Sequence, residues 1–421
     1  MPKQKTSIVF QGVLPIMVGV FLLLVTGCLK SKDPGLPVGV QKALNLAHLN
    51  RPELMKAILT FDAPEDSIQL KSLYFLISNL PQQYSIYVSL ADSQGHSVHL
   101  NPLSFTSKNA IKQHLDSISH ANGTVNYRAD SFHVDLNQVN AQYLTLNVES
   151  AFEIWQDSKW SQEYPFDVFK KWILPYRVAN EPIANFRKHF IQILKDKIPP
   201  SASSFDAINL INNRINNLLT YDPRFDREAN PQGINELEQS KTGSSLDIAI
   251  YKVYALRSLG IPSSIDYCPF YSDTTGGIFT ASALLPDGTW KNLPPKETPF
   301  PFPQNITPKV YRRSFEKIDN SMYSIKERTD HTPPFLGHYD YTDVSNEYLK
   351  VENLHFTDIL NDTKFVYLAV FNDKEWKAID WLKTDSTRNI LFRNVGKAHR
   401  YRLMTVSENE RKYLTDPFFL E

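Results

Sequence analysis

Cysteine is scarce in this chain of 421 residues, and its scarcity limits both cross-linking and chemistry. Cys28 and Cys268 are the only two cysteines. If Cys28 carries a lipid, as argued below, no intramolecular disulfide can form, and stability must come from the burial of apolar side chains. We interpret Cys268 as a small buried apolar side chain.

Ligand sets for metals are also missing from the sequence. No pair of histidines or cysteines has the spacing of a metal site, and His96 and His99 lie in a polar, turn-rich stretch where solvation is the simpler interpretation. The sequence therefore predicts no metal and no cofactor.

Net charge is absent as well. Lys plus Arg equals Asp plus Glu, at 45 each. No overall field therefore attracts the chain to nucleic acid or to an anionic surface, and we expect no nucleic-acid partner.

Internal repeats and low-complexity tracts are missing too. The hydrophobic content of 42% and aromatic content of 12% are typical of a chain that folds into packed cores.

The N-terminus is typical of a bacterial lipoprotein signal peptide. Lys3 and Lys5 precede an apolar run over residues 8–25, which leads into the sequence Leu-Val-Thr-Gly-Cys. A small residue at Gly27 permits cleavage by a peptidase, and the thiol of Cys28 can then accept acyl chains. The sequence therefore predicts a cell-envelope protein with a lipid anchor at Cys28.

The predicted signal peptide covers residues 1–27, and the lipidated cysteine and a polar tether cover 28–40. Stable anchoring requires two or more acyl chains. The alternative is an uncleaved transmembrane helix, but Gln11 and Pro15 interrupt a span that is only 18 residues long. Leu29, which follows the cysteine, is no acidic retention signal, and this favours the outer membrane.

Apolar spacing divides the mature chain into three parts and predicts an α+β fold. We expect a helical N-terminal region over 41–200, a mixed core over 201–330 and a β-rich segment over 331–421. Residues 68–80 and 204–219 repeat apolar side chains with the period of a helix.

The last segment alternates apolar and polar residues at 364–371 and 400–404, which predicts a small antiparallel sandwich. Aromatic rings in such a segment can stack on a sugar, although packing within the protein is the explanation that we favour. The candidate rings are Tyr339, Tyr341, Tyr348 and Trp376.

The most distinctive pattern begins at Lys241. A turn with Gly243 and two serines leads into an apolar helix that closes with Arg-Ser-Leu-Gly-Ile-Pro, ending at Pro262. A strand at 265–267 follows, and then the sequence Asp-Gly-Thr-Trp-Lys-Asn-Leu-Pro at 287–294. In these features the chain resembles the transglutaminase-like superfamily.

This resemblance implies a papain-like cysteine protease core. In that family a helix N-terminus favours a thiolate, a histidine takes its proton, and an acidic residue orients the histidine. Here Ser245 falls on the cysteine position, Ile278 on the histidine position and Pro294 on the acidic position. Residues 190–330 contain no histidine. The resemblance therefore implies a family member whose catalytic residues are lost.

The resemblance extends over most of the mature chain. It is similar to a group of lipid-anchored, transglutaminase-like proteins from the Bacteroidetes, in which a helical front supports the core and a β-rich segment follows. The stretches that carry this likeness are residues 50–54, 74–81, 173–182 and 343–348.

The function that we favour from these features is binding without catalysis. The inherited cleft would hold a peptide or glycan, or the protein would bind a partner protein at the envelope. The residues expected to line the cleft are Ser245, Asp247, Tyr267, Phe279, Trp290 and Tyr176.

Two other hypotheses remain. In one, the protein is an active hydrolase or acyltransferase in which Ser245 or Cys268 acts with a distant histidine. The candidate histidines are His189, His331 and His338. In the other, the lipoprotein is purely structural, and the side chains of Ile278, Phe279 and Trp290 fill its cleft.

Overall fold

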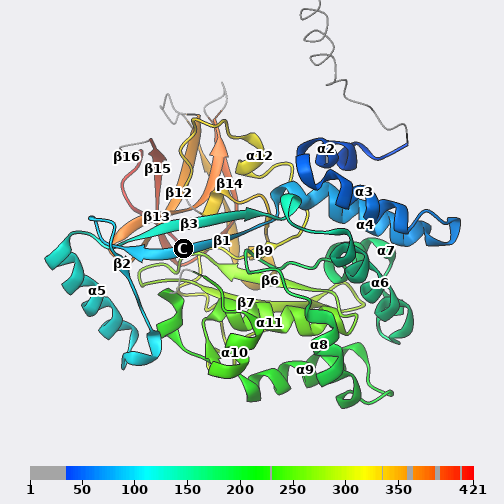
Figure 1. Cartoon of the computed structure of the whole chain (residues 1–421). Coiled ribbons are helices and arrows are strands. Elements are labelled where there is room, and N and C mark those ends of the chain that lie inside the picture. The colour runs from blue at the N-terminus through cyan, green and yellow to red at the C-terminus, as the bar shows by residue number, and fades with distance from the viewer. Residues whose placement is uncertain (1–34, 228–229, 334, 358–363, 385–388, 408–409) are drawn as a thin grey trace, which may run out of the picture.

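The protein has an α+β fold in this computed structural model (Figure 1). The structure describes residues 35–227, 230–333, 335–357, 364–384, 389–407 and 410–421. The predicted signal peptide and the lipidation site at Cys28 lie outside these residues. Within the described ranges, no helix is both long enough and apolar enough to cross a membrane.

The front of the chain is mainly helical but also contains a small sheet. Its helices are α2 (Val38–Leu46), α3 (Arg51–Thr60), α4 (Ser67–Asn79), α5 (Lys108–Asn122), α6 (Ala141–Asp157), α7 (Phe166–Val168), η7 (Phe169–Ile173) and α8 (Phe186–Leu194). Its strands are β1 (Tyr84–Ala91), β2 (Ser97–Val98) and β3 (Asn126–Val134), in the order β2-β1-β3. The prediction of a helical region over 41–200 is therefore incomplete. Strand β3 is exposed along most of its length, so no apolar alternation marks it in the sequence.

The centre of the molecule is an antiparallel sheet with one buried helix against it. The strands are, in order across the sheet, β10 (Tyr341–Asp343), β9 (Tyr311–Arg313), β6 (Ser263–Cys268), β7 (Ile278–Leu284) and β8 (Trp290–Leu293). Helix α11 (Ser245–Ser258) lies along β6 and β7, and α8, α9 (Ser204–Leu218) and α10 (Ile234–Ser240) surround it. Because α11 is covered on all sides, every residue in it except Leu246 is buried.

The two faces of this sheet have different surroundings. Ile265 and Ala281 face α11 and belong to the largest apolar core. Cys268 and Ile278, which are paired in the ladder, point to the other face and pack with Val310. Alternation along each strand thus separates two sets of side chains.

The C-terminal segment is a sandwich. One sheet has the order β13-β12-β15-β16, with β17 also paired to β15, and a second sheet pairs β11 with β14. The bounds are β11 (Val351–Phe356), β12 (Phe365–Asn372), β13 (Glu375–Lys383), β14 (Ile390–Gly396), β15 (His399–Val406), β16 (Arg411–Tyr413) and β17 (Phe418–Leu420). Asp373 and Lys374 both have positive φ, as a two-residue hairpin turn between β12 and β13 requires.

Strand β12 joins the sandwich to the rest of the protein. Val366 and Leu368 point into the sandwich core, whereas Phe365 and Tyr367 point into the large core that includes α11. Lys309 adds a charged link, since its buried Nζ lies 2.6 Å from Asp343 and 2.9 Å from Asp380 of β13. The described parts of all three predicted regions therefore share packed side chains.

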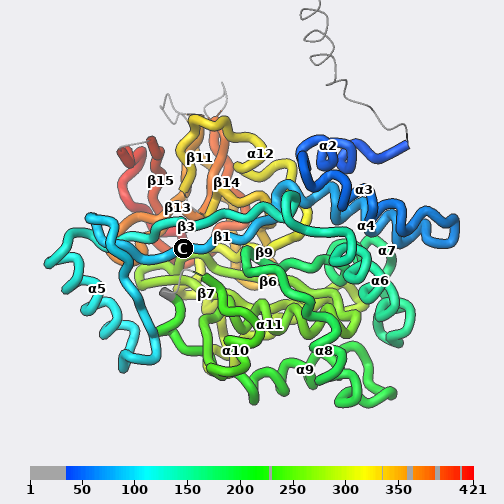
Figure 2. Tube along the Cα trace, in the orientation of Figure 1, coloured from blue at the N-terminus to red at the C-terminus, as the bar shows by residue number. Residues whose placement is uncertain are grey.

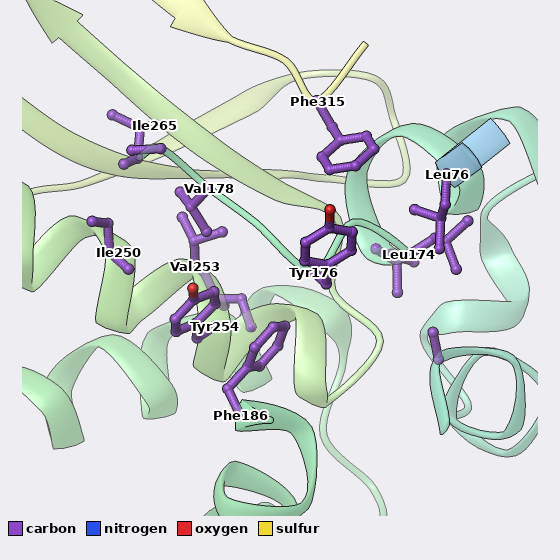
Figure 3. Packing of buried hydrophobic residues seen from close by; sticks show 14 of the residues in the cluster. Leu76, Leu174, Tyr176, Val178, Phe186, Ile250, Val253, Tyr254, Ile265 and Phe315 are labelled. Carbon is purple, nitrogen blue, oxygen red and sulfur yellow. The ribbon is translucent and has the colours of Figure 1, made fainter. Parts of the chain in front are cut away.

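The large core also connects α11 to the front of the chain. The ring of Phe186 on α8 stacks on that of Tyr254 on α11, with centroids 4.0 Å apart. Tyr176 packs against Phe315 nearby (Figure 3). Burial of large rings on both sides of α11 fixes its position.

Candidate functional site

The candidate site is the N-terminus of α11, where the resemblance places a nucleophile. Strand β5 (Thr242–Gly243) leads into the helix and pairs with β4 (Thr220–Tyr221). A Cβ on Gly243 would lie 2.7 Å from Leu237 Cδ1 and 2.9 Å from Gln232 Nε2, so a larger residue at this turn would have to displace the ends of these two side chains.

A capping box closes the first turn of α11. The backbone N–H of Asp247 donates to Ser244 Oγ at 3.1 Å, and the backbone N–H of Ser244 donates to Asp247 Oδ2 at 2.8 Å. Gln232 also donates to Asp247 through its backbone N–H at 2.8 Å. The carboxylate oxygens of Asp247 therefore already accept hydrogen bonds from the protein, and they are not available to a ligand.

Ser245 is the first residue of α11 and is only 4% exposed. Its Oγ accepts a hydrogen bond from the backbone N–H of Phe279 at 3.3 Å. The start of β7 therefore lies directly against the start of α11. Because Phe279 packs on the side of the sheet that faces α11, it is Phe279, not Ile278, that lies opposite Ser245.

A carboxyl group of the chain itself lies near the end of the helix. Asp226, in η9 (Pro223–Arg227), lies close enough to the backbone N–H of Ser245 for this donor to lower the pKa of the carboxyl group. It also accepts a hydrogen bond from Tyr221 Oη at 2.8 Å and pairs with Lys108 Nζ of α5 at 3.3 Å. Burial raises the pKa of Asp226, and these three donors partly oppose that rise. A helix N-terminus favours an anion, and here Asp226 supplies it.

Cys268 cannot replace Ser245 at this position. It lies on the opposite face of the sheet, paired with Ile278, and is fully buried. Burial raises the pKa of its thiol, so the thiolate is disfavoured.

Pro294, at the position where the resemblance places an acidic residue, accepts a hydrogen bond from a buried lysine. The carbonyl of Pro294 accepts a hydrogen bond from Lys252 Nζ at 2.7 Å, and the carbonyl of Leu293 accepts one at 3.0 Å. Lys252 lies in the middle of α11 and is 1% exposed. Burial lowers the pKa of its ammonium group to about 7.

The candidate histidines lie elsewhere in the structure. His189 Nε2 lies 2.8 Å from Glu238, which also accepts from Tyr251 Oη at 2.6 Å. His338 is half-buried near Arg313, and desolvation lowers its pKa. His331 is exposed. Among the described residues, neither Ser245 nor Cys268 has a hydrogen bond to a histidine.

The remaining side chains expected in the cleft do not converge on one cavity. Tyr267 stacks on Phe279, with centroids 5.3 Å apart. Trp290 lies on the other face of the sheet, under the guanidinium of Arg312 at 3.8 Å. Tyr176 donates its hydroxyl to Asp135 at 2.8 Å. In the part of the chain that the structure describes, no group of three or more His, Cys, Asp or Glu side chains is placed to hold a metal.

The sequence analysis missed a cavity of about 470 Å³ between the core and the sandwich. It is lined by Phe270, His331, Thr332, Pro333, Phe335, Trp376, Lys377, Ala378, Met404, Val406, Ser407, Glu410 and Arg411. Trp376 alone among the four aromatic candidates lies there. Tyr339 and Tyr341 are 7% and 8% exposed, and the hydroxyl of Tyr348 donates to Asp266. Tyr339 and Tyr341 therefore offer no open face to a sugar, and Tyr348 is half-buried outside the cavity.

Comparison with known proteins identifies no relative in sequence. No family model matches the chain, and no curated protein matches it. Among solved structures, the chain is weakly similar to a candidate protease from Parabacteroides distasonis ATCC 8503, with 12% identity and a TM-score of 0.23. The match covers 80% of this chain and 65% of the other. A likeness this weak establishes neither fold nor activity.

Lys252 makes stability depend on pH. Its folded pKa of about 7 is below its ordinary value of 10.5, so the unfolded chain binds more protons between these two values. The free energy of unfolding should therefore rise with pH in this window, by up to about 1.4 kcal/mol per pH unit. Denaturant unfolding from about pH 7 to about pH 9 measures this slope. Lys252→Met should remove this dependence of stability on pH, whereas Lys188→Met, at an exposed position, should retain it. Equal slopes in the two variants would show that Lys252 is not the group responsible.

Proposed function

We propose that the protein is a lipid-anchored protein of the bacterial cell envelope that binds a ligand and does not catalyse a reaction. The observation that carries this proposal is the carboxylate of Asp226 at the N-terminus of α11. The anchoring at Cys28, in the outer membrane, rests on the signal-peptide sequence.

A transglutaminase-like ancestry is part of the proposal. A buried helix that starts at a glycine turn and lies along antiparallel strands β6, β7 and β8 is the arrangement that the sequence resemblance implies. Fold likeness alone says nothing about activity. The chemistry must therefore be judged from the side chains at the start of α11.

Acyl transfer requires a nucleophile, a base within about 3 Å and donors that stabilise an oxyanion. The hydroxyl of Ser245 has no histidine partner, and its covered Oγ accepts a backbone N–H. The backbone donor at the helix end faces Asp226 instead of a substrate. A second carboxylate or oxyanion at this position would meet like charge, which opposes its binding.

The cavity between core and sandwich is the binding site that we favour. Phe270, Phe335 and Trp376 supply aromatic surface, which can hold sugar rings or peptide side chains. Glu375 pairs with both Lys377 and Arg411, so their positive charges are locally neutralised. A pocket with rings and little net charge suits a neutral glycan better than a charged peptide.

The test of binding is calorimetric titration of the protein with neutral oligosaccharides and, in parallel, with short peptides. We expect an oligosaccharide to bind, and Trp376→Ala to lower its affinity by about tenfold through loss of one stacking face. Phe419→Ala removes an exposed ring of the same sheet outside the cavity and should leave affinity unchanged. Equal binding by all three proteins would contradict this site, and selective binding of peptides would replace the glycan assignment.

Anchoring is tested separately through the two cysteines. Labelled palmitate should be incorporated into the protein and lost in Cys28→Ser, because only Cys28 follows the predicted cleavage site. Cys268→Ala is the matched control and should keep the label. Palmitate labelling that persists in Cys28→Ser, or that is lost in Cys268→Ala, would contradict the proposed anchor.

A further inference from the structure

An apolar stripe is exposed on the first helix of the described chain. Val38 and Leu46 of α2 are 67% and 53% exposed, and Leu49, in η1 (His48–Asn50), is 97% exposed. Val38, Lys42 and Leu46 recur every four residues, so they share one side of α2. Leu49 follows in a separate turn, after the positive φ of His48. Isolated exposed leucines are ordinary, but three strongly exposed apolar side chains so close together in the chain are not.

The opposite side of α2 is already packed. Val40, Ala43 and Leu44 are buried, and the helix lies mainly against α4. Figure 2 shows α2 on the outside of α3 and α4. The stripe therefore does not complete the core of the protein and faces away from it.

The charges around the stripe have one sign. Residues 36–50 include Lys42 and His48 and contain no Asp or Glu. Apolar side chains flanked by basic residues, without acidic ones, are the combination that favours a helix at the surface of an anionic bilayer. This local arrangement persists although the whole chain has no net charge.

The tether places α2 close to the membrane. If Cys28 carries the acyl chains, the seven residues that lead from it to Gly35 extend at most about 25 Å. Helix α2 then begins three residues later. This step rests on the anchoring proposed above, and it leaves α2 nearer to the lipid than any later element along the chain.

We propose that α2 lies on the lipid bilayer, with Val38, Leu46 and Leu49 inserted among the headgroups and Lys42 at the anionic surface. Such a contact adds to the acyl anchor and fixes the orientation of the protein on the membrane. The partner is the bilayer itself, not a second copy of the chain.

The experiment uses the full-length lipidated protein in vesicles of phosphatidylethanolamine and phosphatidylglycerol. An environment-sensitive fluorophore is attached at Leu49→Cys in the Cys268→Ala background, where acylation blocks the other thiol. We expect its emission to shift to the blue on vesicles and to be quenched by nitroxide-labelled lipids. The matched control is Leu210→Cys on α9, which replaces a leucine that is 41% exposed and should show neither change.

The outcomes separate docking from anchoring. If the protein floats with the vesicles and incorporates palmitate but the label at residue 49 stays in water, docking is wrong and the anchor holds. If neither palmitate nor flotation is found, the anchor itself fails, and the docking proposal falls with it. A blue shift in detergent-free solution that grows with protein concentration would assign the stripe to a second copy, and would also overturn the proposal.

Discussion

The functional interpretation depends on the contact between the carboxylate of Asp226 and the N-terminus of α11. The end of a helix concentrates partial positive charge, and in an enzyme of the resembled superfamily that charge would favour a thiolate. Here Asp226 faces the first N–H of the helix while Tyr221 and Lys108 hold its other contacts. The ion pair with Lys108 also connects the start of α5 to η9.

Both ends of α11 are held by side chains of the protein. At its C-terminal end, the buried guanidinium of Arg257 donates to the carbonyls of Pro175 and Arg177 at 3.1 and 2.8 Å. In the middle, Lys252 donates to the carbonyls that follow β8. These buried side chains donate hydrogen bonds to backbone carbonyls. These contacts give the described ends of α11 a structural role, and our proposal therefore places ligand binding in the cavity beside the sandwich.

The sequence predicts much of the frame because its periodic segments are long. The helix at 204–219 is found at Ser204–Leu218, and strands occur at both alternating C-terminal runs. The position opposite Ser245 was predicted one residue early, at Ile278 instead of Phe279. Both residues are apolar, so nothing in the sequence distinguishes them, yet a shift of one residue along a strand reverses the face.

Other features depend on tertiary contacts between distant residues. Asp226 lies in a loop before α10, and no motif connects it to α11. The cavity takes Phe270 from the end of β6 and Trp376 from β13, which are far apart in sequence. The sequence alone does not distinguish an aromatic residue that lines a cavity from one that fills a core. Tyr339 and Tyr341, which were candidates for sugar stacking, are buried.

The most direct test of the central claim is the thiol pKa of a Ser245→Cys protein, measured from the pH dependence of its alkylation. Our account predicts a pKa above the ordinary value of about 8.5 and slow alkylation at neutral pH, because the new thiol is covered and Asp226 lies beside the backbone N–H of the same residue. Asp226→Asn in the same background should lower that pKa. A thiol that ionises well below about 7 and alkylates rapidly with Asp226 in place would contradict the account, because the helix end would then still be a working nucleophile site.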